Sequence, residues 1–228
     1  MNKIFISGDT HGGYTMEKLF SKSFPDGKKL TKDDYLIIAG DFGFVFHSEE
    51  TKTERYWLKW FIEKPWTTLF VCGNHENHHR LAKLPTIQKF GGIVGVVNDS
   101  IFYLKRGEIY TIGEKKIFCF GGAKSRDIAY RKLNVSYWVE EVPSTQEMQY
   151  AVDNLTKHDG HVDYIIAHTA PDTIISLCGL SSDYIDPTTR FLEFIVNNTK
   201  FDRFFCGHLH MDKTISKYTI LYEDVIEI

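Results

Sequence analysis

The sequence has little cysteine, and its cysteines show no pairing pattern. Only four occur among 228 residues, at Cys72, Cys119, Cys178 and Cys206, and no two of them form a C-x-x-C pair. Three of the four lie in apolar, strand-like runs. A zinc-finger site is excluded, because it needs a closely spaced set of thiolates and imidazoles. We therefore expect buried, reduced thiols rather than disulfides.

Long apolar segments and a dominant charge of one sign are also missing. The amino-terminal MNKIFISGDTH reaches Asp9 after a short apolar run, so it fits neither a secretory signal nor a membrane span. The formal net charge of −3 gives no general attraction to nucleic acid or to anionic membranes. These features predict a cytoplasmic protein without a membrane partner. They leave open a local basic groove for nucleic acid, and they do not determine the oligomeric state.

The material that is present suits one sizeable hydrophobic core. The chain is 43% hydrophobic and 25% charged, which is typical of globular proteins. It contains no internal repeat, low-complexity stretch or Pro/Ser-rich linker. We therefore expect residues 1–228 to form a single α/β domain.

Short runs rich in Ile, Val, Phe and Tyr predict strands that are buried on both faces. The five clearest runs cover residues 3–7, 35–39, 68–71, 164–167 and 203–205. More closely spaced β runs predict hairpins over residues 93–120 and short strands over 213–228. The summed pattern is that of two packed β-sheets with helices outside.

Helices are expected between these strands, at residues 14–22, 53–63 and 145–157. Thr51 or Thr53 is a suitable cap for the second helix. For the third, Ser144 and Glu147 have the spacing of a capping box.

Each of the five buried-strand candidates ends directly in polar residues that can bind metal. These residues are Asp9 and His11 in GDTH, Asp41 in AGDFG, Asn74 and His75 in CGNHE, His168 in AHT, and His208 and His210 in CGHLH. The carboxyl ends of parallel strands converge at one edge of an α/β sheet, where ligands bind. Side chains spread over some 200 residues are therefore expected to meet in one place.

The residue types at these strand ends favour a metal centre. Carboxylates and imidazoles without thiolates suit Mn²⁺, Fe or Zn²⁺. Taken singly, a Gly-Asp pair is ordinary turn chemistry and an H-x-H sequence occurs on many surfaces; the ordered recurrence at five strand ends is what favours metal. The remaining histidines, which lack this context, are expected to be surface or loop residues: His47, His78, His79, His158 and His161.

The motif set D-x-H, G-D, G-N-H-[DE], H and G-H-x-H between residues 9 and 210 resembles that of the calcineurin-like metallophosphoesterase superfamily. The resemblance implies a four-layer αβ sandwich of two packed mixed β-sheets flanked by helices, with a dinuclear site on one edge. It implies one metal held by Asp9, His11, Asp41 and His210. A second metal would be held by Asp41, Asn74, His168 and His208, with Asp41 bridging the two.

The same resemblance implies that His75 does not bind metal but protonates the leaving oxygen or stabilises charge in the transition state. The cofactor is expected to be two divalent or mixed-valence ions, with manganese first and iron or zinc as alternatives. His75 and Asp41 are thus the expected catalytic residues, and Asn74 is also expected to contact substrate.

One motif departs from the protein Ser/Thr phosphatases of this superfamily, and one insertion could shape the substrate pocket. Their GDxxDRG motif reads GDFGFVF here, with Phe44 and Val45 in place of the Asp and Arg, so a protein-phosphatase activity is not expected. In addition, residues 121–138 form an insertion that carries Lys124, Arg126 and Arg131. Arg126 or Arg131 could bind a phosphate bidentately, although loop arginines are usually just solvated.

The resulting hypothesis is a dinuclear metal-dependent hydrolase of phosphodiesters or phosphomonoesters, with nucleotides among the candidate substrates. A metal-bridging hydroxide would attack phosphorus in line with the leaving group. Two alternatives stay open at this point. One is a nuclease or nucleic-acid end-processing enzyme, which needs a basic channel, and the other is a non-catalytic protein-binding scaffold of the same fold.

Overall fold

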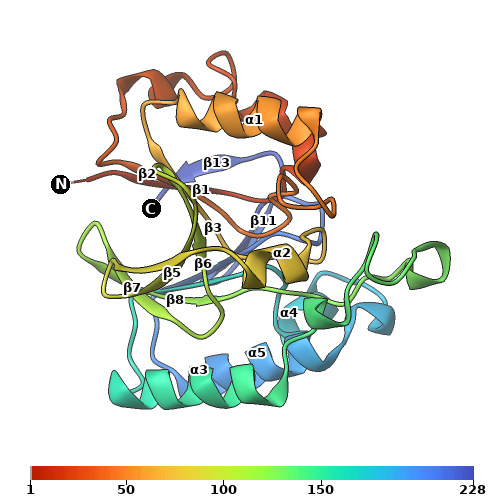
Figure 1. Cartoon of the computed structure of the whole chain (residues 1–228). Coiled ribbons are helices and arrows are strands. Elements are labelled where there is room, and N and C mark those ends of the chain that lie inside the picture. The colour runs from red at the N-terminus through yellow and green to blue at the C-terminus, as the bar shows by residue number, and fades with distance from the viewer. Residues whose placement is uncertain (1) are drawn as a thin grey trace.

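A computed structural model describes residues 2–228 of the chain. Two mixed β-sheets pack face to face, and helices cover their outer faces (Figure 1). This arrangement confirms the predicted αβ sandwich. Both ends of the described chain lie on the same side of the molecule, beside β1 and β13.

The first sheet runs in the order β13-β1-β2-β3-β6-β5-β4. Its strands are β1 (Ile4–Ser7), β2 (Tyr35–Ile38), β3 (Thr67–Phe70), β4 (Thr86–Lys89), β5 (Gly92–Asn98), β6 (Ile101–Leu104) and β13 (Val225–Glu227). The central strands β1, β2, β3 and β6 are parallel, and the outer strands are antiparallel to their neighbours.

The second sheet runs in the order β11-β12-β10-β9-β8-β7. Its strands are β7 (Ile109–Ile112), β8 (Lys115–Phe120), β9 (Tyr164–Ala167), β10 (Arg203–Cys206), β11 (Lys213–Ile215) and β12 (Tyr218–Ile220). The predicted hairpins of residues 93–120 are present, but the chain changes sheets between them. β5 pairs with β6 in the first sheet, and β7 pairs with β8 in the second.

Three apolar clusters explain why the central strands are hydrophobic on both faces. Residues such as Ile37, Ile166 and Phe205 fill the space between the two sheets. The opposite face of the first sheet packs against α1 (Lys52–Ile62), and that of the second packs against α3 (Thr145–Lys157), α4 (Asp172–Leu177) and α5 (Pro187–Asn198) (Figure 1). Because both faces are covered, no alternation of polar and apolar residues is needed.

The helix starts follow from local capping. Thr51 accepts a hydrogen bond from Glu54 N at the start of α1, and Ser144 accepts one from Glu147 N at the start of α3. Each pair forms the reciprocal capping box. The short α2 (His78–Ala82) begins after Asn77.

The predicted helix at residues 14–22 is wrong. The region contains one short 3₁₀ turn instead, at Met16–Leu19, and another precedes it at His11–Gly13. Lys18 turns inward, where its Nζ donates to the carbonyl oxygens of Gly8 and Asp9 at 3.0 and 2.7 Å and to that of Tyr222. These long-range bonds satisfy strand-end carbonyls, and local helix propensity does not anticipate them.

The burial of side chains tests two further expectations, one for the histidines and one for the cysteines. His78 is 7% exposed, so its assignment to the surface is wrong, whereas its neighbour His79 is half-exposed beside Glu140. All four cysteines are free, with Cys72, Cys119 and Cys206 buried. Among the described residues no helix is long and apolar enough to cross a membrane.

The insertion after β8 extends away from both sheets, and we call residues 121–141 the arm. It contains two single turns of 3₁₀ helix, at Ile128–Tyr130 and Val139–Glu141. Figure 1 shows it projecting beyond α2 and α4, on the side of the molecule opposite the termini.

Candidate metal centre

The carboxyl ends of strands from both sheets meet at one edge of the molecule. β1, β2 and β3 of the first sheet lead into Asp9, Asp41 and Asn74, and β9 and β10 of the second lead into His168 and His208. The sequence predicted that the strand ends would converge, and the structure adds that two packed sheets supply them. The interface between the sheets therefore opens directly onto the candidate centre.

Asp9, His11 and His210 form one group of potential ligands. The Nε2 atoms of His11 and His210 lie 2.9 Å apart, and Asp9 Oδ2 lies 3.3 Å from His210 Nε2 and 3.6 Å from His11 Nε2. Asp9 is fully buried, and its carboxylate also accepts from the backbone N–H of His208 at 3.1 Å. Two imidazoles and a carboxylate this close are a suitable donor set for Mn²⁺, Fe or Zn²⁺.

Asp41, His168 and His208 form a second group. The Nδ1 of His168 lies 2.9 Å from the carbonyl oxygen of Ala39, which can only accept, so Nδ1 carries a proton. The other nitrogen, Nε2, lies 3.1 Å from Asn74 Oδ1 and 3.3 Å from Asp41 Oδ1. A cation between these three atoms would displace the Nε2 proton and be held by the nitrogen and both oxygens.

Asp41 lies between the two groups. Its Oδ1 faces His168 Nε2 at 3.3 Å, and its Oδ2 lies 3.6 Å from His11 Nδ1. A carboxylate shared by two cations must reach both ligand groups, and Asp41 contacts one residue of each. His75 Nε2 is 3.9 Å from Asp41 Oδ2, and His11, Asp41 and His75 form a third possible group, so geometry alone does not separate His75 from the ligands.

The backbone at the centre is held in an uncommon conformation. Four of the candidate ligands have φ in the left-handed region, at +46° for His11, +48° for Asp41, +64° for His208 and +48° for His210. Residues other than glycine seldom adopt such angles, which cost about 1–3 kcal/mol each and cluster at functional sites. Gly40, with φ +88°, lies so close to the His168 ring that an added Cβ would overlap it.

The charges of these groups shift one another's titration. Burial alone would raise the pKa of Asp41, but the surrounding histidines hold it well below its usual value. Burial alone would lower the pKa of His168, yet the charge of Asp41 and their hydrogen bond raise it to about 10. Burial, together with the charge of His168, lowers the pKa of His208 to about 3. The buried carboxylates of the centre thus favour a positive charge between them.

A family model described as calcineurin-like phosphoesterase matches residues 2–212. The chain belongs to this family. Membership of a phosphoesterase family favours the predicted hydrolase over the non-catalytic scaffold. A search of curated proteins finds no match. Among solved structures, the chain is similar to a "putative 5'-nucleotidase from Staphylococcus aureus in complex with alpha-ketoglutarate", with 12% identity and a TM-score of 0.47. That match covers 96% of this chain but 48% of the other, so the chain spans about half its length.

This phosphoesterase has apolar side chains where protein phosphatases carry their Asp and Arg. Phe44 and Val45 are 0% and 2% exposed and belong to the core cluster beneath α1. They cannot bind a phosphate in the cleft. Their burial agrees with the expectation drawn from GDFGFVF.

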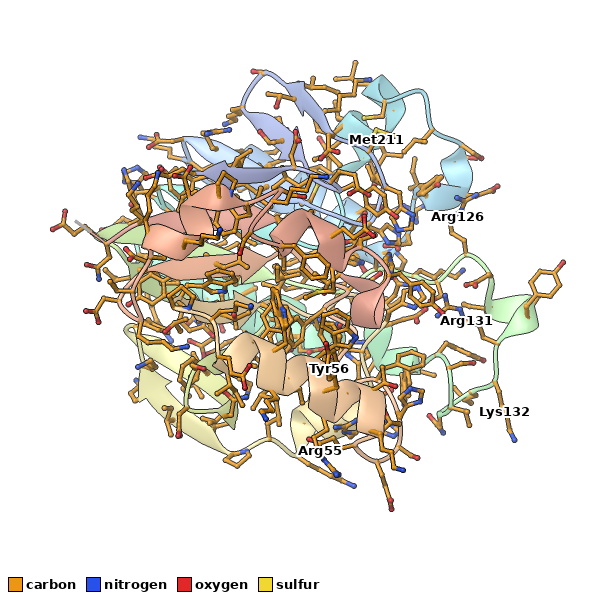
Figure 2. All side chains as sticks on the ribbon, turned by 90° about the horizontal axis from the view of Figure 1, so that it is seen from above. Arg55, Tyr56, Arg126, Arg131, Lys132 and Met211 are labelled. Atoms are coloured by element: carbon orange, nitrogen blue, oxygen red, sulfur yellow. The ribbon has the colours of Figure 1, made fainter. Side chains whose placement is uncertain are left out.

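An arginine of the arm contacts His75 instead. Arg131 Nη2 lies 2.9 Å from His75 Nε2, and because a guanidinium only donates, this nitrogen of His75 is the acceptor. Asp127 holds the Arg131 Nε at 2.6 Å. Figure 2 shows Arg131 and Lys132 on the arm, with Lys132 directed away from the body. Arg126 lies against the Tyr184 ring, 3.8 Å from its centroid.

These side chains line a cleft of about 690 Å³ over the candidate centre. His11, Asp41 and His75 form part of its floor, and Tyr14, Arg126 and Arg131 are among the residues around it. The two predicted arginines therefore do reach the cleft. So does His47, a loop histidine to which the sequence assigned no role.

Glu76, the last residue of GNHE, has a role that was not predicted from the sequence. It is 0% exposed and accepts from the backbone N–H of Gly43 at 2.8 Å and from that of Gly73. It thereby joins the loop that carries Asp41 to the loop that carries Asn74. Burial and the charge of Asp41 raise its pKa to about 8, although both hydrogen bonds oppose this shift. Its position inside the GNHE motif was the sequence signal that could have indicated this role.

Proposed function

We propose that this phosphoesterase hydrolyses small phosphate esters at a centre of two metal ions. The first ion would be held by Asp9, His11, Asp41 and His210, and the second by Asp41, Asn74, His168 and His208. The observation that supports this most directly is the pair of neighbouring ligand groups, with one carboxylate oxygen of Asp41 beside His168 and the other beside His11. Single carboxylates in that position are typical of dinuclear sites.

Different residues around the centre would bind the phosphoryl group and transfer the proton. Bound cations supply positive charge that polarises the phosphoryl group and makes a water acidic near neutral pH. Arg131 would bind a phosphoryl oxygen through two N–H groups. Once Arg131 turns from His75 to substrate, His75 Nε2 is free to carry the proton that the leaving oxygen needs. Asp127 keeps the guanidinium close to the cleft while it is empty of substrate.

Cleft size favours a small-molecule substrate. The volume of about 690 Å³ lies within the range of about 300–1,000 Å³ for such sites. A phosphodiester and a phosphomonoester both satisfy the geometry, and a nucleotide is a candidate because Tyr14 and Tyr184 offer aromatic surface beside the centre. A nucleic-acid substrate would make the Michaelis constant rise steeply with added salt, whereas a small ester would not.

Three further properties belong to the same proposal. Mn²⁺ is the expected metal, with Fe or Zn²⁺ as alternatives, because the donor set combines carboxylates with imidazoles. The chain is proposed to act as a single domain, in line with the family match over residues 2–212. A cytoplasmic location is proposed, supported by the free thiols of Cys72, Cys119 and Cys206.

The test is to strip the protein of metal, restore it with Mn²⁺ and count bound ions by mass spectrometry. Hydrolysis of p-nitrophenyl phosphate and of bis-p-nitrophenyl phosphate is measured in parallel. Two ions per chain with turnover supports the proposal, and the faster substrate identifies monoester or diester chemistry. One ion per chain at full activity overturns the dinuclear centre. Neither metal nor turnover overturns the proposed function as a whole.

A further inference from the structure

A buried chain of hydrogen bonds joins the arm to the side chain of Asn74. Asn74 Nδ2 donates to Ser125 Oγ at 3.1 Å, and Ser125 Oγ donates to Glu141 Oε2 at 2.8 Å. The backbone N–H of Ser125 donates to the other carboxylate oxygen, Glu141 Oε1, at 2.6 Å. Asn74, Ser125 and Glu141 are 4%, 2% and 1% exposed, so water does not compete for these bonds.

The order of donors in this chain fixes the orientation of the Asn74 amide. A carboxylate only accepts, so the single hydroxyl proton of Ser125 points to Glu141. Toward Asn74, the hydroxyl can then act only as an acceptor, and the NH₂ group must face it. The carboxamide oxygen is left pointing the other way, 3.1 Å from His168 Nε2 and toward the second group of candidate ligands.

The Glu141 end of this hydrogen-bond chain is itself anchored at the base of the arm. Arg106, 6% exposed, donates from Nη2 to the Glu141 carbonyl oxygen and from Nε to the Gly121 carbonyl oxygen, each at 2.9 Å. One guanidinium therefore holds both ends of the arm, and Glu141 has a fixed backbone from which to bind Ser125. The hydrogen-bond chain is thus rigid from Arg106 to Asn74.

We infer that Ser125 and Glu141 are positioning residues that hold the Asn74 carboxamide oxygen toward the cation. This inference rests on the proposed function, in which Asn74 is a metal ligand. It makes the arm part of the metal centre as well as of the substrate cleft. Partners of this kind around a ligand are worth about 10–100-fold in metal affinity or activity.

A Glu141→Gln substitution provides a test that a purely structural role would fail. The Gln oxygen must accept from the backbone N–H of Ser125, which places its NH₂ group against Ser125 Oγ. The hydroxyl then accepts from Gln and donates to Asn74, so the amide is forced to reverse. Side-chain volume and the number of hydrogen bonds are conserved, but an NH₂ group now faces the cation site.

The experiment compares wild type with Ser125→Ala, Ser125→Thr and Glu141→Gln. Glu140→Gln is the matched control, because Glu140 is an exposed neighbour that pairs with His79. Isothermal calorimetry with Mn²⁺ alone measures the two dissociation constants, and thermal melts confirm that each variant is folded. We expect Ser125→Ala to weaken one of the two sites about 10–100-fold and Glu141→Gln to weaken it at least as much. Ser125→Thr keeps the hydroxyl and should retain the wild-type affinity.

The result that overturns the inference is two wild-type dissociation constants in folded Ser125→Ala or Glu141→Gln protein. Equal losses in Glu141→Gln and the control Glu140→Gln would overturn it too, since they would reflect charge alone. If wild type itself binds no Mn²⁺, the proposed function fails and the inference fails with it. The wild-type titration therefore separates the two failures.

Discussion

The floor of the cleft and the arm beside it are built on different principles. The floor and the buried side chains beneath it follow buried strands, so the backbone of two packed sheets places Asp41 in the cleft and Asp9 and His168 below it. The arm follows β8 but has only two single turns of helix, and buried polar side chains hold it. Arg106 fixes its base, and Asp186 accepts from the backbone N–H of Lys124 at 2.8 Å.

This difference separates what each region contributes. Under the proposed function, the strand ends carry ligands that must not move, because a metal centre tolerates little change in distance. The arm carries Arg131, which would exchange His75 for a phosphoryl oxygen when substrate binds. Substitutions of the proposed ligands should therefore affect metal binding, and substitutions on the arm should affect substrate binding, except at Ser125 and Glu141.

The largest effect is expected on the floor, from Asp41→Asn. The change removes a carboxylate that faces both ligand groups. Several kcal/mol of charge stabilisation are lost, so kcat should fall at least about 10⁴-fold, since 1.36 kcal/mol corresponds to tenfold. Steady-state kinetics and metal counting measure this, and two bound ions with full activity would rule out the shared-ligand role.

His75→Ala should lower kcat about 10²–10⁴-fold while leaving both metal ions bound. The reason is the loss of a proton donor beside the leaving oxygen. Metal content decides between this role and a ligand role, because His75 also lies within reach of His11 and Asp41. A drop to fewer ions per chain would make His75 a ligand.

On the arm, Arg131→Ala should lower kcat/KM about 10–100-fold, mainly through KM, with metal content unchanged. This corresponds to the loss of a charged hydrogen bond worth about 1.5–3 kcal/mol. Lys132→Ala is the matched control, because Lys132 is exposed and points away from the body (Figure 2). Similar kinetics for the two variants would contradict a phosphate contact by Arg131.

The smallest effect is expected at the other end of β2, from Asp34→Asn. Partial burial would raise the pKa of Asp34, but hydrogen bonds from the backbone N–H groups of Lys3 and Thr31 lower it. The ionised carboxylate therefore stabilises the fold above its unfolded pKa of about 3.9, and this stability is lost as the pH falls through the lower folded value.

At pH 7 we expect Asp34→Asn to reduce the free energy of unfolding by about 1 kcal/mol without changing activity. Urea unfolding at several pH values measures this, and the difference from wild type should shrink below about pH 4. A constant difference down to pH 2, or a loss of activity, would contradict the assignment. Asp34→Asn should therefore change stability alone, whereas Asp41→Asn, at the opposite end of β2, should change activity.

The sequence predicted the floor of the cleft better than the arm because the two regions depend on different kinds of contact. Strands β1, β2, β3, β9 and β10 are short apolar runs, and each candidate ligand lies within a few residues of the end of one. The capping boxes of α1 and α3 are also local patterns. Contacts among residues near in sequence leave a signal that periodicity and spacing reveal.

What could not be predicted depends on contacts between residues far apart. Lys18 bonds across the chain to Tyr222, and residues 14–22 contain a single 3₁₀ turn in place of a helix. His78 is buried although the sequence assigned it to the surface or a loop. The pairing of Arg131 with His75 spans 56 positions, and that of Asn74 with Ser125 spans 51. No short motif encodes such pairs.

The two ends of the arm meet at a single side chain, and this has a consequence for how the enzyme can change. Arg106 holds the arm at Gly121 and Glu141. The residues between these two points form the tip of the arm, which can be exchanged as a unit. Loop length adds little to the free energy of closure, about 0.6 kcal/mol for each doubling. Residues beyond Ser125 can therefore be replaced or lengthened while the hydrogen-bond chain to Asn74 remains. Under the proposed function, new substrates can be acquired at the tip while the metal centre is inherited unchanged.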